Sequence, residues 1–103
     1  MNSRSKPTAY QVTEVEIIDA EAYKTLGQAV SATQQQEGFR ILTTAFGRVV
    51  AFVGEPPKNV GIAEFDSLDQ LMAYRNSQAF KDLGPQRDKA FKIIRQYAVE
   101  AAN

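Results

Sequence analysis

The residues of this chain that could do chemistry are carboxylates, arginines, tyrosines and hydroxyls, because it contains no histidine and no cysteine. The missing cysteine excludes disulfides, thiolate nucleophiles, zinc–thiolate sites and iron–sulfur clusters. The missing histidine removes the usual general base, the usual haem ligand and most transition-metal sites. We therefore expect any catalysis to proceed without a metal or cofactor, through Asp, Glu, Lys, Arg, Tyr, Ser or Thr side chains.

Glu64 is the leading catalytic candidate, because it lies near the end of the apolar segment VGIAEF at positions 60–65. If it points into a cavity between a sheet and a partner, burial would raise its pKa into the range useful for proton transfer. The alternative is that Glu64 pairs with a cation or caps a helix.

Two arginines and a second glutamate could complete such a site. Arg40 and Arg87 carry the guanidinium fork that suits a carboxylate or an enolate, and the alternative is that they pair with Glu64, Glu14 or Asp88. Glu14 could form a pair with Glu64 in which one carboxyl stays protonated. Its alternative is exposure on the surface of a sheet.

Tyr10, Tyr74 and Tyr97 could donate hydrogen bonds to a ligand, although such residues are more often core aromatics with a solvated tip. Ser77 is better interpreted as a helix N-cap than as a nucleophile, since the chain has no base of the Ser–His type.

The composition indicates one globular domain. The chain has 103 residues, and its 12 basic and 12 acidic residues balance, so it offers no basic field for nucleic acid or anionic lipid. No segment approaches the length of a membrane span, and a cytoplasmic location is expected. We expect residues 1–8 to be a disordered polar leader, residues 9–100 to form the domain, and residues 101–103 to be a tail.

Strands and helices alternate along the domain. Residues 9–17, 39–44, 60–65 and 91–100 have the period of two and the β-branched content of strands. A turn at Gly47 and an extended stretch over 48–54 precede a proline-bearing loop. A helix is predicted over 20–36, begun by Asp19 and ended by Gly38.

Two further helical segments are predicted before the last strand. Ser67 with Gln70 fits a capping box, and Ser77 begins a short helix that Gly84-Pro85 closes. The order β-α-β-(β)-β-α-β predicts an α+β fold, a ferredoxin-like sandwich of an antiparallel sheet with helices on one face. The second face then lacks a cover, and its apolar residues predict a homodimer closed sheet to sheet.

Two stretches resemble a known family. AYQVTEVEIIDAEAY and VGIAEFDSLDQLMAYRNSQAFKDLGPQRDKA are similar to the opening and the signature of the domain of unknown function 1330 family, a branch of the dimeric α+β barrel superfamily. The matching positions are Ala9, Tyr10, Glu14, Val15, Asp19, Glu21, Ala22, Tyr23, Glu64, Phe65, Ser67, Ser77, Phe80, Leu83 and Arg87. The resemblance spans residues 9–100 and implies the fold and the dimer. The wider superfamily includes metal-free monooxygenases, lactone isomerases and polyketide cyclases, and fold alone does not choose among them.

Some polar positions of that family are replaced here. Thr44 stands where an Arg is common, Val53-Gly54 where Glu-Gly is common, Asn59 in place of an Arg, and Phe80 in place of a Tyr. These departures weaken any activity carried over from relatives.

Two functions follow as hypotheses. In the first, each subunit has a small apolar pocket at the sheet–helix boundary and acts on a carbonyl or aromatic metabolite by isomerase, cyclase or lactone-type chemistry. Glu64 would transfer the proton, Arg40 or Arg87 would stabilise the oxyanion, and Tyr10 would orient the substrate. In the second, the dimer is a non-catalytic ligand-binding or accessory protein with a degenerate site.

Overall fold

The chain alternates strands and helices in the predicted order, with one additional helix before the last strand. The computed structural model describes residues 6–102. Its elements are β1 (Ala9–Ile17), α1 (Ala20–Glu37), β2 (Phe39–Thr43), β3 (Asn59–Phe65), α2 (Leu68–Arg75), α3 (Gln78–Asp82), α4 (Gly84–Ala90) and β4 (Phe91–Glu100).

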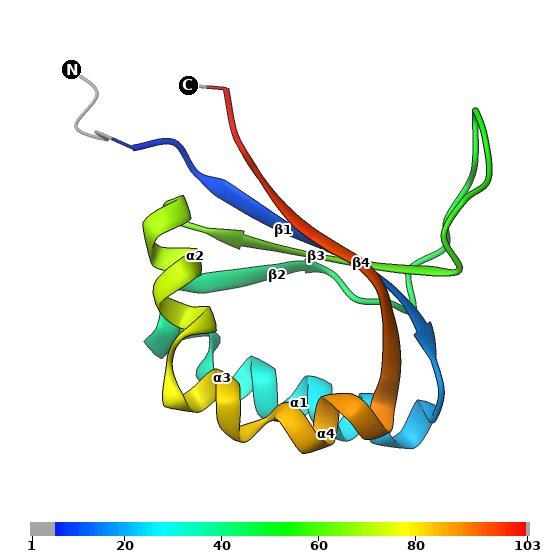
Figure 1. Cartoon of the computed structure of the whole chain (residues 1–103), viewed down its shortest axis with the longest axis horizontal. Helices are drawn as coiled ribbons and strands as arrows, with labels where there is room; N and C mark the ends of the chain where they lie inside the picture. The colour runs from blue at the N-terminus through cyan, green and yellow to red at the C-terminus, as the bar shows by residue number, and fades with distance from the viewer. Residues whose placement is uncertain (1–5, 103) are drawn as a thin grey trace.

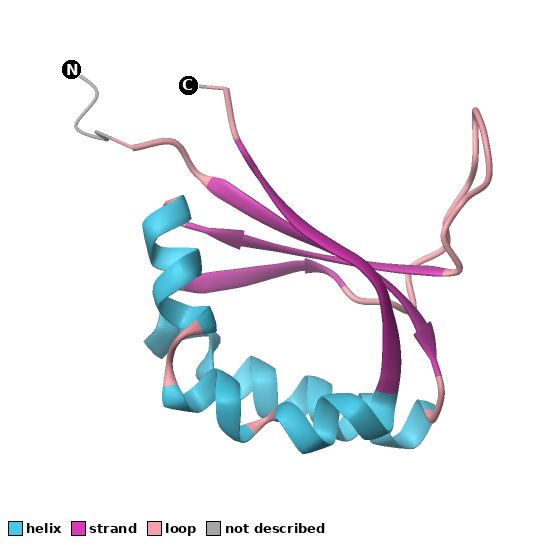
Figure 2. Ribbon diagram, in the orientation of Figure 1, coloured by secondary structure: helices cyan, strands magenta, loops and turns pink. Residues whose placement is uncertain are grey.

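The four strands form one antiparallel sheet in the order β2-β3-β1-β4. This order, with a helix after β1 and helices after β3, is the ferredoxin-like arrangement, so the predicted fold class is confirmed. All helices lie on one side of the sheet, as Figures 1 and 2 show. None of the helices in the described part of the chain is long and apolar enough to cross a membrane.

The helix boundaries follow local signals in the sequence. The Asp19 carboxylate accepts a hydrogen bond from the backbone N–H of Ala22 at 3.0 Å, and α1 ends where Gly38 adopts a φ of 78°. Ser67 and Ser77 begin α2 and α3, each with its hydroxyl accepting a backbone N–H three residues on. These side chains satisfy N–H groups that a helix start otherwise leaves without a partner.

One helix was missed in the sequence. The pair Gly84-Pro85 was expected to close the helical region, but it begins α4 instead. Proline suits the first turn of a helix, where its missing N–H is not needed and its φ is already helical. This correction places Arg87 on a helix that lies over the sheet.

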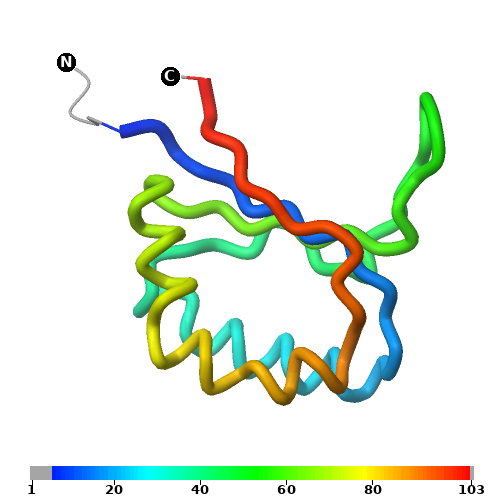
Figure 3. The backbone as a smooth tube through the Cα atoms, in the orientation of Figure 1, coloured from blue at the N-terminus to red at the C-terminus, as the bar shows by residue number. Residues whose placement is uncertain are grey.

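The extended stretch expected over 48–54 is not a strand. Residues 46–58 form a projecting arm between β2 and β3, and its tip residues Phe52 and Val53 are 93% and 96% exposed. Figure 3 shows that this projecting arm rises on the side of the sheet away from the helices.

The predicted N-terminal leader falls partly outside the described residues. Residues 1–5 lie outside them, whereas Thr8 is nearly buried and its carbonyl accepts the backbone N–H of Ala101 at 2.7 Å. The β1–β4 pairing therefore continues one step beyond the strand ends.

Candidate functional site

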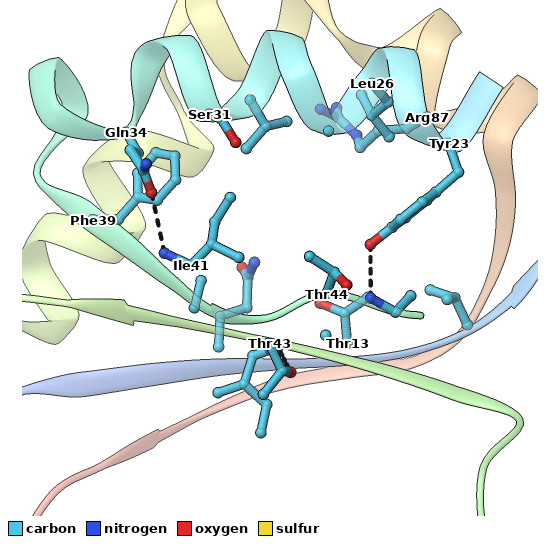
Figure 4. Close-up of a pocket in the computed structure, with 18 of the residues that line it drawn as sticks. Thr13, Tyr23, Leu26, Ser31, Gln34, Phe39, Ile41, Thr43, Thr44 and Arg87 are labelled. Atoms are coloured by element: carbon cyan, nitrogen blue, oxygen red, sulfur yellow. Dashed lines mark hydrogen bonds between the residues drawn. The ribbon is translucent and has the colours of Figure 1, made fainter. Parts of the chain in front are cut away.

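A cavity of about 850 Å³ lies between the sheet and the helix layer. Its floor comes from the inner sides of the strands, and its roof comes mainly from α1 (Figure 4). The lining includes Gln11, Thr13, Val15, Tyr23, Leu26, Gly27, Val30, Ser31, Gln34, Phe39, Ile41, Thr43, Ala63, Phe65, Tyr74, Phe80, Arg87, Phe91 and Gln96. Its size is within the usual range of small-molecule sites.

Two hydrogen bonds connect α1 to the β2 side of the sheet, one near each end of the helix. The hydroxyl of Tyr23 accepts the backbone N–H of Ala45 at 2.8 Å, and the side-chain oxygen of Gln34 accepts the N–H of Ile41 at 3.2 Å. Figure 4 shows both contacts, with the open space between them.

Small side chains leave the middle of this space empty. Gly27 lies on the face of α1 that carries Tyr23 and Val30, and a Cβ added to it would meet no atom within 4 Å. On the floor, β3 contributes the small residues Gly61 and Ala63, which lie opposite Thr13 and Gln11 of β1. A helix glycine costs stability relative to alanine, and here it enlarges the cavity.

Aromatic side chains close one end of the cavity. Phe39, Phe65 and Tyr74 lie with ring centres 4.9 to 5.8 Å apart, and Phe80 packs edge-on against Tyr74 at 5.3 Å. Burial raises the pKa of Tyr74 above its ordinary value, so its hydroxyl stays protonated at neutral pH and can donate a hydrogen bond.

Arg87 lines the cavity from α4 beside this aromatic end. Its Nη1 donates to the carbonyl of Phe80 at 2.8 Å, and its guanidinium carbon lies 3.8 Å from the centre of the Phe80 ring. Burial lowers the pKa of Arg87 from its usual value, but an arginine remains protonated in proteins.

A network of polar side chains on the inner side of the sheet was not predicted from the sequence. Arg75 Nη1 donates to the side-chain oxygens of Gln11 and Gln96, each at 2.9 Å, and Gln96 donates to the Thr13 hydroxyl at 2.9 Å. The signal was present, because the alternation of residues 9–17 places Gln11 and Thr13 on the face that also carries the buried Val15.

The other side of the sheet, which we call the outer face, carries most of the predicted site residues. It is formed by Tyr10, Val12 and Glu14 of β1, Val60, Ile62 and Glu64 of β3, Arg40 of β2, and Arg95, Tyr97 and Val99 of β4. No helix of the described chain covers this face (Figure 2).

Glu14 is held in a tight ion pair on the outer face. It is only 8% exposed, and its carboxylate accepts hydrogen bonds from Arg95 at 2.6 and 2.9 Å and from the Tyr97 hydroxyl at 3.1 Å. The hydrogen bond from Arg95 is the main cause that lowers the pKa of Glu14. The hydrogen bond that the Tyr97 hydroxyl donates to Glu14 raises the pKa of Tyr97.

Glu64 has a partner of its own. Arg40 Nε donates to its carboxylate at 2.9 Å, and Arg40 also reaches Asp66 at 3.5 Å. The hydrogen bond to Glu64 is the main cause that raises the pKa of Arg40. Tyr10 stands directly opposite Glu64 in the β1–β3 register.

The structure therefore separates the six predicted site residues into two groups. Tyr74 and Arg87 line the cavity, whereas Tyr10, Glu14, Arg40 and Glu64 lie on the outer face. Glu14 and Glu64 are each paired with a different arginine. Among residues 6–102 no group of three or more carboxylates lies close enough to hold a metal ion.

The sequence matches the model of one protein family, described as a domain of unknown function (DUF1330), over residues 8–102. The chain belongs to this family. The resemblance of the two sequence stretches to this family is thereby confirmed. The DUF1330 match includes all the strands and helices of the described residues, from β1 to β4. No curated protein matches the chain significantly.

Solved structures show the same fold. A protein of unknown function from Rhodopseudomonas palustris, RPA0582, superimposes with a TM-score of 0.73 at 14% identity, over 98% of this chain and 87% of that one. The methylated form of RPA0582 superimposes with a TM-score of 0.69 at 14% identity, over 98% and 85% of the two chains. At this identity the likeness of a DUF1330 chain to these structures concerns the fold alone.

The ion pair of Glu14 with Arg95 should contribute to the free energy of unfolding at neutral pH and lose that contribution in acid. Because its pKa is lowered in the folded protein, its contribution is fully present above the ordinary value of 4.5 and is lost as the pH falls through the lowered pKa. Thermal unfolding of wild type and Glu14→Gln should therefore differ at neutral pH and converge on acidification. The exposed Glu21→Gln serves as control and should track wild type. A Glu14→Gln difference that persists unchanged in acid would contradict this explanation.

Proposed function

We propose that the protein binds a small, largely apolar molecule in the cavity between the sheet and the helices. The observation that carries this proposal is the make-up of the lining, which is mostly aromatic and aliphatic and includes no Asp or Glu. Binding sites typically combine such walls with a few polar groups that orient the ligand. Here Tyr74, Arg87 and Gln96 can supply those groups.

The lining favours binding over proton-transfer chemistry. Tyr74, which is buried, and Arg87, which is half-buried, can donate hydrogen bonds and stabilise negative charge. The carboxylates expected to act as a base lie on the other side of the sheet. Lys24, the other cation of the lining, is 61% exposed in its side chain and lies near Glu21. The second hypothesis drawn from the sequence, a ligand-binding protein, is therefore the better supported.

Filling the cavity from Gly27 should weaken ligand binding without loss of stability. In Gly27→Leu the new side chain would enter the open space, and we expect the dissociation constant for the apolar dye Nile red to rise at least about tenfold. Both Gly27→Leu and Gly27→Ala should raise the free energy of unfolding by up to about 1 kcal/mol, because glycine is a poor helix former.

Gly27→Ala is the matched control, since it improves the helix yet leaves most of the cavity open, and it should bind the dye as wild type does. Dye fluorescence measures binding, and urea titration measures stability. Equal binding by Gly27→Leu and wild type would place the dye elsewhere and refute the proposal.

We further propose that two chains form a homodimer through their outer faces. Val12, Ile62 and Tyr97 form an apolar centre on this face, with one acid–arginine pair on each side of it. A second copy offers the same apolar centre and the same balance of charges, which suits a two-fold contact. The projecting arm rises on this side of the sheet and would flank the second copy (Figure 3).

A lysine in this apolar centre should separate the subunits. We expect wild type to sediment at twice the chain mass and Val12→Lys to sediment as a folded monomer, because an unpaired charge is costly in a buried interface. Met72→Lys, on the 49% exposed Met72 of α2, is the control and should remain dimeric. A Val12→Lys protein that still dimerises, or a wild type that is monomeric at high concentration, would refute the outer-face dimer.

A metal-free isomerase, cyclase or lactone-type activity remains a second candidate. It is favoured by one observation: Tyr10, Glu64 and Arg40 stand in one row across β1, β3 and β2 of the outer face. If catalysis occurs between the two sheets of the dimer, Glu64→Gln should abolish turnover of any small carbonyl or aromatic compound that wild type converts, while sedimentation still shows the dimer. Turnover that survives in Glu64→Gln would remove this residue from the mechanism.

A further inference from the structure

Arg87 differs from the two arginines that form ion pairs with carboxylates, Arg40 and Arg95. Arg40 and Arg95 each bond a carboxylate within 3 Å. Within residues 6–102, by contrast, no carboxylate oxygen lies within 4 Å of the Arg87 guanidinium, and its hydrogen bond is to the carbonyl of Phe80. This cation thus lines an apolar cavity without a matching anion.

A second guanidinium increases the positive charge at this end. The guanidinium carbon of Arg75 lies 5.1 Å from the centre of the Phe80 ring, and that of Arg87 lies 3.8 Å from it. Arg75 is held by the side chains of Gln11 and Gln96, and both of these glutamines line the cavity. Neutral amides fix the position of Arg75 but leave its charge uncompensated, so both arginines favour an anion nearby.

The remaining donors of Arg87 suit a planar acceptor. One Nη1 bond goes to the Phe80 carbonyl, and stacking on Phe80 fixes the plane of the guanidinium. A guanidinium has five N–H donors in a fixed fork, and its geometry matches a carboxylate, which can accept two parallel hydrogen bonds. Burial is the main cause that lowers the pKa of Arg87, and the nearby charge of Arg75 acts in the same direction, whereas Asp88 acts against it.

From these contacts we infer that the cavity selects apolar molecules that end in a carboxylate, with the carboxylate on Arg87 and the apolar body under α1. This inference rests on the proposed binding function and specifies the class of ligand. The Tyr74 hydroxyl, at the same end of the cavity, can donate a further hydrogen bond to the head group. Arg75 acts through its charge and through the position of Phe80, not by touching the ligand.

Two probes of equal apolar size separate the head-group preference from cavity binding. Naphthalene carboxylate and naphthalene methanol share the ring system and differ in charge at the head. We expect calorimetry on the full chain to show the carboxylate bound about tenfold or more tightly than the alcohol, because hydrogen bonds to a charged group are stronger.

Substitutions at Arg87 assign the preference to this residue. Arg87→Gln should remove the preference and keep the affinity for the alcohol. Arg87→Lys should retain part of it, since lysine keeps the charge but not the fork. Lys81→Gln removes an exposed cation of α3 that lies outside the lining and should behave as wild type. Circular dichroism establishes that each variant is folded.

The possible outcomes distinguish failure of the carboxylate inference from failure of the proposed binding function. Two results would overturn the assignment to Arg87 while cavity binding stands. One is equal affinity of wild type for the two probes, and the other is a carboxylate preference that survives in folded Arg87→Gln. Binding of neither probe by wild type overturns the proposed function and this inference together.

Discussion

Two hydrogen bonds, Tyr23 to Ala45 and Gln34 to Ile41, set the separation of α1 from the sheet, and the cavity depends on that separation. Side chains between these contacts are too small to fill the gap, above all at Gly27 and Ala63. Close packing is the rule in protein interiors. A space of this size between the two layers forfeits van der Waals contacts that a ligand could restore, and this is the physical argument for the proposed binding function.

The strand period of two explains why the residues that resemble a catalytic set do not meet. Neighbouring residues of a strand point to opposite sides, so Glu64 lies on the outer face while Ala63 and Phe65 line the cavity. The two carboxylates that could have shared a proton are instead each neutralised by an arginine. The outer face is thus suited to association, and the inner side is suited to a ligand.

Local features of the fold could be predicted from the sequence, and two of the predicted site residues, Tyr74 and Arg87, do line the cavity, whereas the contacts between distant residues could not be predicted. Asp19, Gly38, Ser67 and Ser77 act within one helical turn, so their effect is visible in a short stretch. The bonds that Arg75 makes to Gln11 and Gln96 join positions 64 and 21 residues apart, and they depend on strand register. Arg87 was placed wrongly with respect to secondary structure because Gly84-Pro85 was interpreted as a stop.

An NMR titration of the isotopically labelled full chain with naphthalene carboxylate tests the cavity most directly, because it locates the ligand on individual residues. We predict that the backbone signals of Gly27, Ala63 and Phe91, which line the cavity, will shift together with the side-chain Nε–H of Arg87. The signals of outer-face residues such as Val12 should not move. Shifts confined to the outer face, or no saturable shift in the cavity, would contradict a ligand site between the sheet and the helices.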